Sequence, residues 1–352
     1  MRTVLAITSA VCVLVMAALV VASPRTASAC AGLIGSNGAV NLGRTTTLSG
    51  YHEGVEHYVT AFEFQGGGGE FGTLIPLPGV PSKVERGGDW TLQRLVRETQ
   101  VLKFAEFGEA LAAAPSAEVL QQVRIDALDI TVLKGGGPDV ATWATQHGFR
   151  LSPDAPEVLD FYAKRSPIFL AAVFDGEAAA ARGQQIGDGT PVHITIPTSN
   201  PWVPLRILGL GKQPDDRVDA DVFLLTDSKP ALLPGPRVGL TLAHSEKATD
   251  SLLADLRSDA SGDWVPQSAW LTKLEVNSSA ADLQYDLAID TTRAHDPSRV
   301  AAGLELPDTS LLRDDGSAAP LVWVAVVGIL ALLIALFVLR LQANAGPRSP
   351  RV

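Results

Sequence analysis

Cysteine is nearly absent from this sequence of 352 residues, which contains only Cys12 and Cys30. Cys12 lies in an apolar run near the N-terminus, so at most one cysteine remains in the rest of the chain. That region cannot form an intramolecular disulfide. Its length nevertheless allows an apolar core large enough to stabilise a domain.

Motifs for catalysis or cofactor binding are also lacking. The sequence has no G-x-S-x-G nucleophile motif, and its six histidines are dispersed. The stretch GGGEFG, 67–72, matches G-x-G-x-x-G, but it continues into TLIPLP, which cannot form the helix that a dinucleotide site requires. We therefore predict a glycine-rich hairpin tip there and no cofactor, and no motif indicates an enzyme.

Basic residues are scarce relative to acidic ones, with 28 Lys and Arg against 38 Asp and Glu. The imbalance is larger between the apolar ends of the chain, where residues 30–319 hold 23 basic and 38 acidic residues, a formal charge of −15. Such a surface keeps a domain soluble and argues against nucleic acid or anionic lipid as a partner.

The N-terminus has the features of a secretory signal. Arg2 precedes an apolar run over 4–22, and the small residues Ala27 and Ala29 form the A-x-A pattern that signal peptidase accepts. We predict a signal peptide over 1–29, cut between Ala29 and Cys30.

Three alternatives to this cut stay open. The apolar run is long enough to act as an uncleaved anchor. Cys30 directly after the cut invites lipidation, although Ala27 stands where a lipobox prefers Leu, Val or Ile. A second A-x-A, from Ala29 to Ala31, would remove Cys30 altogether.

The C-terminal region contains a membrane-spanning pattern. Residues 321–339, LVWVAVVGILALLIALFVL, are 19 consecutive apolar residues, or about 28 Å of helix. Arg340, Arg348 and Arg351 follow, with no acidic residue after Asp315, as the positive-inside preference requires. We predict a transmembrane helix over 320–340, a basic cytoplasmic tail over 341–352, and an ectodomain outside the cell.

An acidic segment without a sustained period, 294–319, precedes this helix and is predicted to be a juxtamembrane stalk. Within it, LPDTS, 306–310, nearly matches the L-P-x-T-G signal for attachment to the cell wall, which would place a cut at Thr309. Ser310 in place of glycine and the ten residues before the apolar run weaken that match.

The ectodomain, 30–293, shows more strand patterns than helix patterns, without regular alternation between them. This order favours an α+β fold over α/β. Asp89 is a candidate N-cap for the first helix. Strands are expected at 40–48, 55–65, 70–81, 122–134, 167–174, 192–197, 203–210, 221–226, 270–276 and 283–289, and helices at 89–99, 139–148, 153–164 and 245–257.

The stretch HEGVEH, from His52 to His57, is the most suggestive for chemistry. A zinc protease needs H-E-x-x-H on a helix, whereas these histidines are five residues apart around Gly54. In a hairpin His52 and His57, with Glu53 and Glu56, could form part of a metal site, but a third protein ligand from elsewhere would be needed. The competing interpretation is an exposed hairpin tip.

Several segments, taken in order, resemble the bacterial family called domain of unknown function 2330. They are CAGLIG, FEFQGGGGEFGTLIPLPGVP, VATWATQHGF, VLDFYAKRSPIFLAAVF, VHITIPTSNPWVPLRILGL and WLTKLEVNSSAADLQYDL. The resemblance covers most of 30–290 and implies an exported protein, often with a C-terminal membrane helix. It implies no activity, ligand or catalytic residue.

We predict a β-rich α+β ectodomain with several helical insertions on a single-pass protein of the cell membrane. The expected function is that of a membrane-tethered envelope protein with an extracytoplasmic binding or structural module, whose partner the sequence does not name. The alternatives are a metal-dependent hydrolase on the secreted side and a surface protein attached to the wall by a sortase.

Overall fold

The structure of this chain is a computed structural model that describes residues 27–28, 32–35, 44–63, 71–99, 118–183, 189–291 and 296–305. All of them belong to one compact unit, Met1–Leu306. No helix within these ranges is long and apolar enough to cross a membrane. The predicted membrane helix over 320–340, the cut after Ala29 and the wall-sorting site at Thr309 lie outside the described residues.

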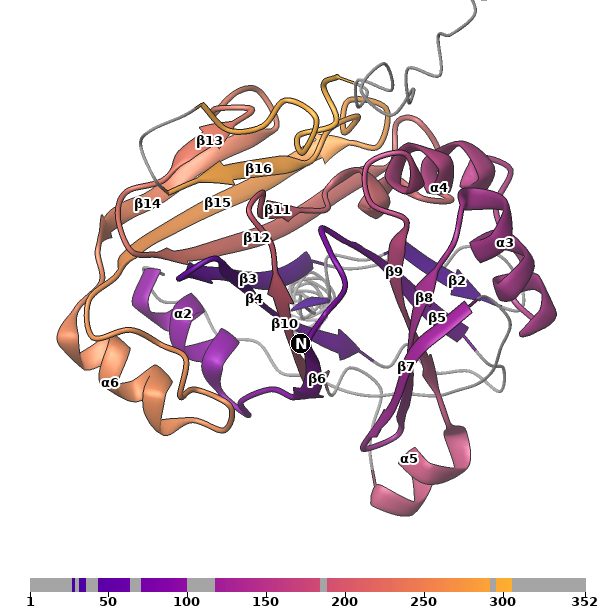
Figure 1. Cartoon of the computed structure of the whole chain (residues 1–352), viewed down its shortest axis with the longest axis horizontal. Helices are drawn as coiled ribbons and strands as arrows, with labels where there is room; N and C mark the ends of the chain where they lie inside the picture. Colours follow the sequence, from indigo (N-terminus) through magenta and orange to yellow (C-terminus); the bar gives the residue numbers. More distant parts are fainter. Residues whose placement is uncertain are drawn as a thin grey trace, which may run out of the picture. The chain divides into compact units, whose positions relative to one another are not determined.

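An eight-stranded sheet forms the centre of the fold (Figure 1). Its order is β14–β15–β12–β3–β4–β10–β6, with β1 pairing to β3. The pair β12–β3 is parallel, as is β1–β3, and the other pairs are antiparallel. The strands are β1 (Ala27–Ser28), β3 (Arg44–His52), β4 (Val55–Glu63), β6 (Lys83–Arg86), β10 (Gly189–Pro197), β12 (Arg217–Thr226), β14 (Leu240–Lys247) and β15 (Trp270–Ser279).

Two smaller antiparallel sheets complete the β structure. A five-stranded sheet has the order β2–β5–β9–β8–β7, and a three-stranded sheet has the order β11–β16–β13. Their strands are β2 (Gly32–Gly35), β5 (Phe71–Leu77), β7 (Glu118–Ile125), β8 (Leu128–Lys134), β9 (Ile168–Phe174), β11 (Trp202–Val203), β13 (Ala231–Leu233) and β16 (Leu287–Asp290). Strands therefore dominate, helices are inserted among them, and the predicted α+β class is confirmed.

The helices fall into groups by the sheet they cover (Figure 1). α2 (Thr91–Thr99) and α6 (Asp250–Ser258) lie side by side and bury Leu92, Leu95, Leu252 and Leu256 in a small core with Leu48 and Phe223 of the large sheet. α3 (Gly137–Gln146) and α4 (Ala155–Ala163) pack against the five-stranded sheet, and α5 (Gly176–Arg182) follows β9. A short 3-10 helix, η1 (Arg206–Gly209), follows β11.

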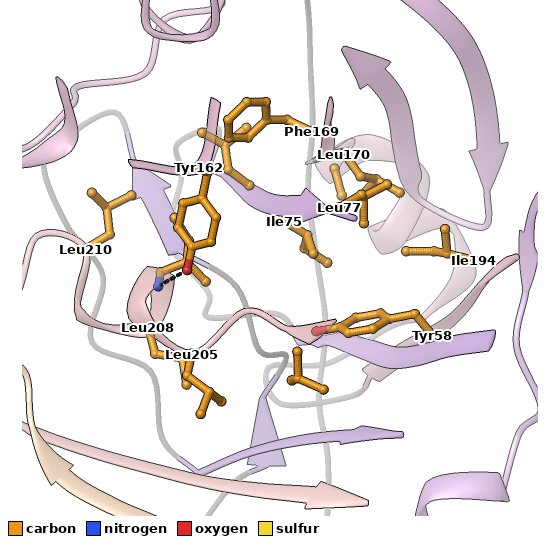
Figure 2. Close-up of a cluster of buried hydrophobic side chains, with 14 of the residues drawn as sticks. Tyr58, Ile75, Leu77, Tyr162, Phe169, Leu170, Ile194, Leu205, Leu208 and Leu210 are labelled. Atoms are coloured by element: carbon orange, nitrogen blue, oxygen red, sulfur yellow. Dashed lines mark hydrogen bonds between the residues drawn. The ribbon is translucent and has the colours of Figure 1, made fainter. Parts of the chain in front are cut away.

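The main core fills the space between the other face of the large sheet and the two smaller sheets. Figure 2 shows side chains of this core that come from distant segments, among them Tyr58 of β4, Ile75 of β5, Ile194 of β10, and Leu205 and Leu208 of the segment after β11. The backbone N–H of Ile207 donates to the hydroxyl of Tyr162 at 2.8 Å. That bond holds η1 against α4.

Two of the predicted strands were wrong. The run 122–134 is a hairpin, because Asp126 takes a left-handed conformation (φ 54) and turns the chain between β7 and β8. In the run 203–210 the strand ends at Val203 and η1 follows over Arg206–Gly209, because the backbone N–H groups of Leu205 and Arg206 turn inward and donate to Asp286 at 2.7 and 3.0 Å. An apolar run does not distinguish these conformations.

Other boundaries also moved. The predicted helix 245–257 begins only at Asp250, after the edge strand β14, because Thr249 caps it by accepting from the N–H of Leu252. The carboxylate at the start of α2 belongs to Asp259 and not to Asp89, since Asp259 accepts from the N–H groups of residues 89 and 90. A long-range cap of this kind leaves no local sequence signal.

The last described segment, 296–305, is bound to the folded unit by Arg165. This guanidinium donates to the Ala301 carbonyl at 2.7 Å and forms a buried ion pair with Asp286. The side chains of Ala301 and Ala302 are buried as well. The fold thus extends to Glu305, into the predicted stalk, because backbone carbonyls and small apolar side chains make these contacts without any periodic pattern.

Candidate functional site

The four ionisable residues of the β3–β4 hairpin, which the sequence offers as candidate metal ligands, lie in different environments. β3 and β4 are joined by Glu53 and Gly54, which both have positive φ, 50 and 80 degrees, as the tightest two-residue hairpins require. Only this turn is exposed. Side chains alternate along β4, so Glu56 and His57 enter opposite faces of the large sheet, and both are buried. For these two residues the exposed-tip interpretation is wrong.

His57 forms a pair with His193, which comes from the neighbouring strand β10. Nδ1 of His57 lies 2.9 Å from Nε2 of His193, and the two side chains are 9% and 3% exposed. One ring nitrogen must donate and the other accept, so the hydrogen bond requires at least one neutral imidazole. Burial lowers the pKa of His57 to about 3, helped by the charges of His193 and His52. Burial, with a smaller effect of Lys83, lowers the pKa of His193 to about 4.

The indole of Trp264 covers this pair. It stacks on His57 with 4.3 Å between ring centroids and 5 degrees between planes. Gly50 makes the stacking possible, because a Cβ at that position would lie 2.2 Å from Cη2 of Trp264. Gly50 pairs with His57 across β3 and β4, so the absence of a side chain at Gly50 allows the indole to lie directly against His57.

Trp264 is held by a loop, 259–265, that follows α6. Asp259 fixes the start of the loop by accepting from the hydroxyl of Thr91 at 2.8 Å, and Ser261 donates to the Arg86 carbonyl at 2.7 Å. Gly262 is packed tightly, since a Cβ there would lie 2.1 Å from the Leu256 carbonyl.

Under the loop is a pocket of about 10 Å³, close to the smallest space that holds one water molecule. It is lined by Leu48, Val59, Gly88, Thr91, His193, Leu256, Ala260, Ser261, Gly262, Trp264 and Val265.

A carboxylate lies on the far side of His193. Oε1 of Glu85 is 3.5 Å from Nδ1 of His193, too far for a good hydrogen bond, and this nitrogen is buried with no other partner. Glu85 in turn pairs with Lys83 at 2.7 Å. Because a carboxylate faces Nδ1, we infer that the proton of neutral His193 resides there, which leaves Nε2 to accept from His57.

Glu56 is fully buried on the other face of the sheet. Its Oε1 accepts from the hydroxyl of Ser49 at 2.7 Å, while Oε2 has no partner. Burial raises the pKa of Glu56 to about 8, opposed by this hydrogen bond and by one from the backbone N–H of Trp202. The carboxyl is therefore protonated at neutral pH.

The proposed metal ligands do not converge. Nδ1 of His52 lies 2.6 Å from Oδ1 of Asp227, His57 pairs with His193, Glu53 is exposed, and Glu56 faces the opposite core. Within the ranges that the structure describes, no three His, Cys, Asp or Glu side chains are arranged to hold a metal ion.

Residues 24–287 match the family described as "Uncharacterized protein conserved in bacteria (DUF2330)". The chain belongs to the DUF2330 family. This confirms the resemblance noted from the sequence segments, and the DUF2330 description carries no activity. The chain has no match among curated proteins.

Two solved structures resemble this DUF2330 chain weakly. Both are crystal structures of a mutated baculovirus P35 after caspase cleavage. The 2.7 Å structure has 10% identity over 70% of this chain and 99% of that chain, with a TM-score of 0.38. The 3.1 Å structure has 8% identity over 72% and 98%, with a TM-score of 0.36. Similarity at this level supports no conclusion about fold or function.

Sequence reasoning found one member of the histidine cluster, His57, and missed His193, Glu85 and Trp264. Alternation in PVHITIP predicts that His193 and Thr195 share a face of β10. No sequence feature indicates that this face meets His57, because the two strands are 126 residues apart between their nearest ends.

Proposed function

We propose that this DUF2330 protein is a membrane-tethered protein of the bacterial envelope, with its folded unit outside the membrane as a binding or structural module. The order of segments along the chain carries the proposal. An apolar run with an A-x-A site comes first, the folded unit follows, and 19 apolar residues with a basic tail come last.

The distance to the membrane would be short. Only 15 residues separate Glu305, the last described residue, from Leu321, the first residue of the apolar run. A chain of that length spans at most about 54 Å when fully extended. The tether would also begin at a fixed point, because Arg165 binds the 296–305 segment to the buried Asp286. A partner of this module would therefore be sought close to the membrane surface.

Cysteine labelling in intact cells tests the topology. Val238 is 99% exposed, so Val238→Cys offers an accessible thiol on the folded unit, in a chain where Cys12 and Cys30 are replaced by Ser. We expect a membrane-impermeant maleimide to label it without permeabilisation. The matched control, Ser349→Cys in the basic tail, should react only after permeabilisation. Equal labelling of both, or the opposite order, contradicts the proposal.

Intact mass of the native protein distinguishes the possible forms of attachment. A mass matching 30–352 or 32–352 corresponds to a cleaved signal and a retained C-terminal segment. Added acyl mass on Cys30 would indicate a lipoprotein. A chain ending at Thr309 with a wall fragment would indicate a sortase substrate and would replace the membrane tether by wall attachment.

A further inference from the structure

We propose that the His57–His193 pair and the indole of Trp264 form an acid-sensitive latch, which releases Trp264, in the second half of the loop 259–265, from the sheet when both imidazoles carry a proton. The proposal rests on three contacts: the 2.9 Å nitrogen–nitrogen bond, the stacking of Trp264 on His57, and the seat of Trp264 on Gly50. It does not depend on the membrane topology proposed above.

The two protons have different consequences. The first added proton leaves the hydrogen bond intact with its direction reversed. His193, which has the higher pKa, then carries the charge, and its Nε2–H donates to Nδ1 of a neutral His57 whose own proton is on Nε2. The second proton must take Nδ1 of His57, which is now the acceptor of the bond. It breaks the bond and leaves two positive rings with centroids 5.2 Å apart in a buried place.

Few groups near the His57–His193 pair could neutralise two positive imidazoles. β6 provides Glu85, which already pairs with Lys83, and the end of β3 provides His52, which is bound to Asp227. In the loop, Asp259 is committed to the start of α2. The buried residues of α2 and α6 on this face are leucines and Thr91. The repulsion between the two charged rings is then relieved by their separation. Because Trp264 stacks on His57, that separation displaces Trp264.

The anchors of the loop confine the motion. Asp259 and Ser261 hold its first half through bonds to α2 and to the Arg86 carbonyl, neither of which involves a histidine. The half that carries Trp264 has the stacking contact and the N–H of Val265, which donates to the Gly262 carbonyl within the same loop. It ends at the buried side chain of Val265 and at the Pro266 carbonyl, which accepts from Arg257 at 2.7 Å, so the motion is confined to Trp264 and its immediate neighbours. Opening would expose the small pocket and the face of the sheet around Gly50, while the main core stays folded.

Fluorine NMR of the full-length protein labelled with 5-fluorotryptophan tests the latch. The Trp264 signal is assigned with Trp264→Phe, and the pH is lowered from 7 to about 2, past both pKa values. We expect this signal to shift reversibly as the pH falls below about 4, with its midpoint near the lower pKa of about 3, while the signals of buried Trp143 and Trp202 stay in place. His57→Gln keeps a hydrogen-bonding side chain without a charge, and should abolish the shift.

Two more variants keep the test decisive. His193→Gln replaces His57→Gln if the latter does not fold. Glu85→Gln removes the carboxylate beside His193, so it should move the Trp264 transition to lower pH. The proposal is overturned if Trp264 does not respond down to about pH 2, below both pKa values, if it moves together with Trp143 and Trp202, or if the response persists in both histidine variants.

Discussion

Glu56 and His57 are neighbours in β4, yet burial affects them in opposite ways. On the side of the main core, Glu56 keeps its proton, with a pKa raised to about 8. On the side of α2 and α6, His57 loses its proton, with a pKa lowered to about 3. Both groups are neutral at pH 7 because a buried charge without a partner is costly. Alternation along one strand thus gives the two faces opposite responses to pH.

The signs follow from proton linkage. The folded state holds the proton of Glu56 more tightly than the unfolded state does, so its contribution is full below about pH 4.5 and is lost as the pH rises to about 8. The folded state holds protons on His57 and His193 less tightly, so their contribution is present above about pH 6.5 and is lost as the pH falls toward 4 and 3.

The largest expected effect concerns the buried ion pair of Arg165 and Asp286, which lies on the Glu56 side of the sheet. Asp286→Ala removes the acceptor of Tyr162, of Leu205 N and of the Arg165 ion pair. It leaves a buried guanidinium, so we expect a loss of about 3–5 kcal/mol in the free energy of unfolding. Urea unfolding at pH 7 measures this loss in the free energy of unfolding. The exposed Asp215→Ala should change the value by less than about 0.5 kcal/mol; an equal loss in both would contradict the argument.

Glu56→Gln tests directly whether Glu56 keeps its proton in the folded state. The amide cannot ionise, so the wild-type protein should lose stability relative to this variant as the pH rises from 5 to 8, by up to about 1.4 kcal/mol per pH unit. The measurement is urea unfolding of both proteins at several pH values. A difference that stays constant over this range would mean that Glu56 does not hold its proton in the folded state.

Gly50→Ala disturbs the other face. The added Cβ would meet the indole of Trp264, which must move off His57, and overpacking of this kind costs about 1–3 kcal/mol. Gly235→Ala is the control, because no atom lies within 4 Å of its Cβ position and its φ is not positive. Thermal unfolding should separate the two variants. Equal melting temperatures would show that the Trp264 seat is not tightly packed.

The smallest expected effect concerns the helices that cover the histidine face. Thr249→Ala removes the hydroxyl that accepts from Leu252 N at the start of α6, at a cost of about 1 kcal/mol. Thr249→Ser keeps the oxygen and should retain most of the stability. If the serine variant loses as much stability as the alanine variant, the hydrogen bond of the cap is not the cause of the loss.

Local patterns were a good guide to element type where one face of a regular element is buried. β4, β9, β12 and β15, and the helices α2, α3 and α4, lie within a few residues of their predicted ranges. Patterns failed where a distant residue decides the conformation. Asp286 bends the run after β11 into η1, and Asp259 provides the cap of α2. Neither effect has a local signal, because each depends on a side chain more than 80 residues away.

The sequence by itself determined the family, the α+β class and the order of apolar and acidic segments along the chain. These depend on composition and on side-chain periods that act over a few residues. Only the tertiary structure decided that His57 meets His193 and Trp264, while Glu56 faces a different core. A strand fixes which residues point to opposite sides, but the neighbours on each side come from other strands and loops, and burial among those neighbours sets the charge of each group.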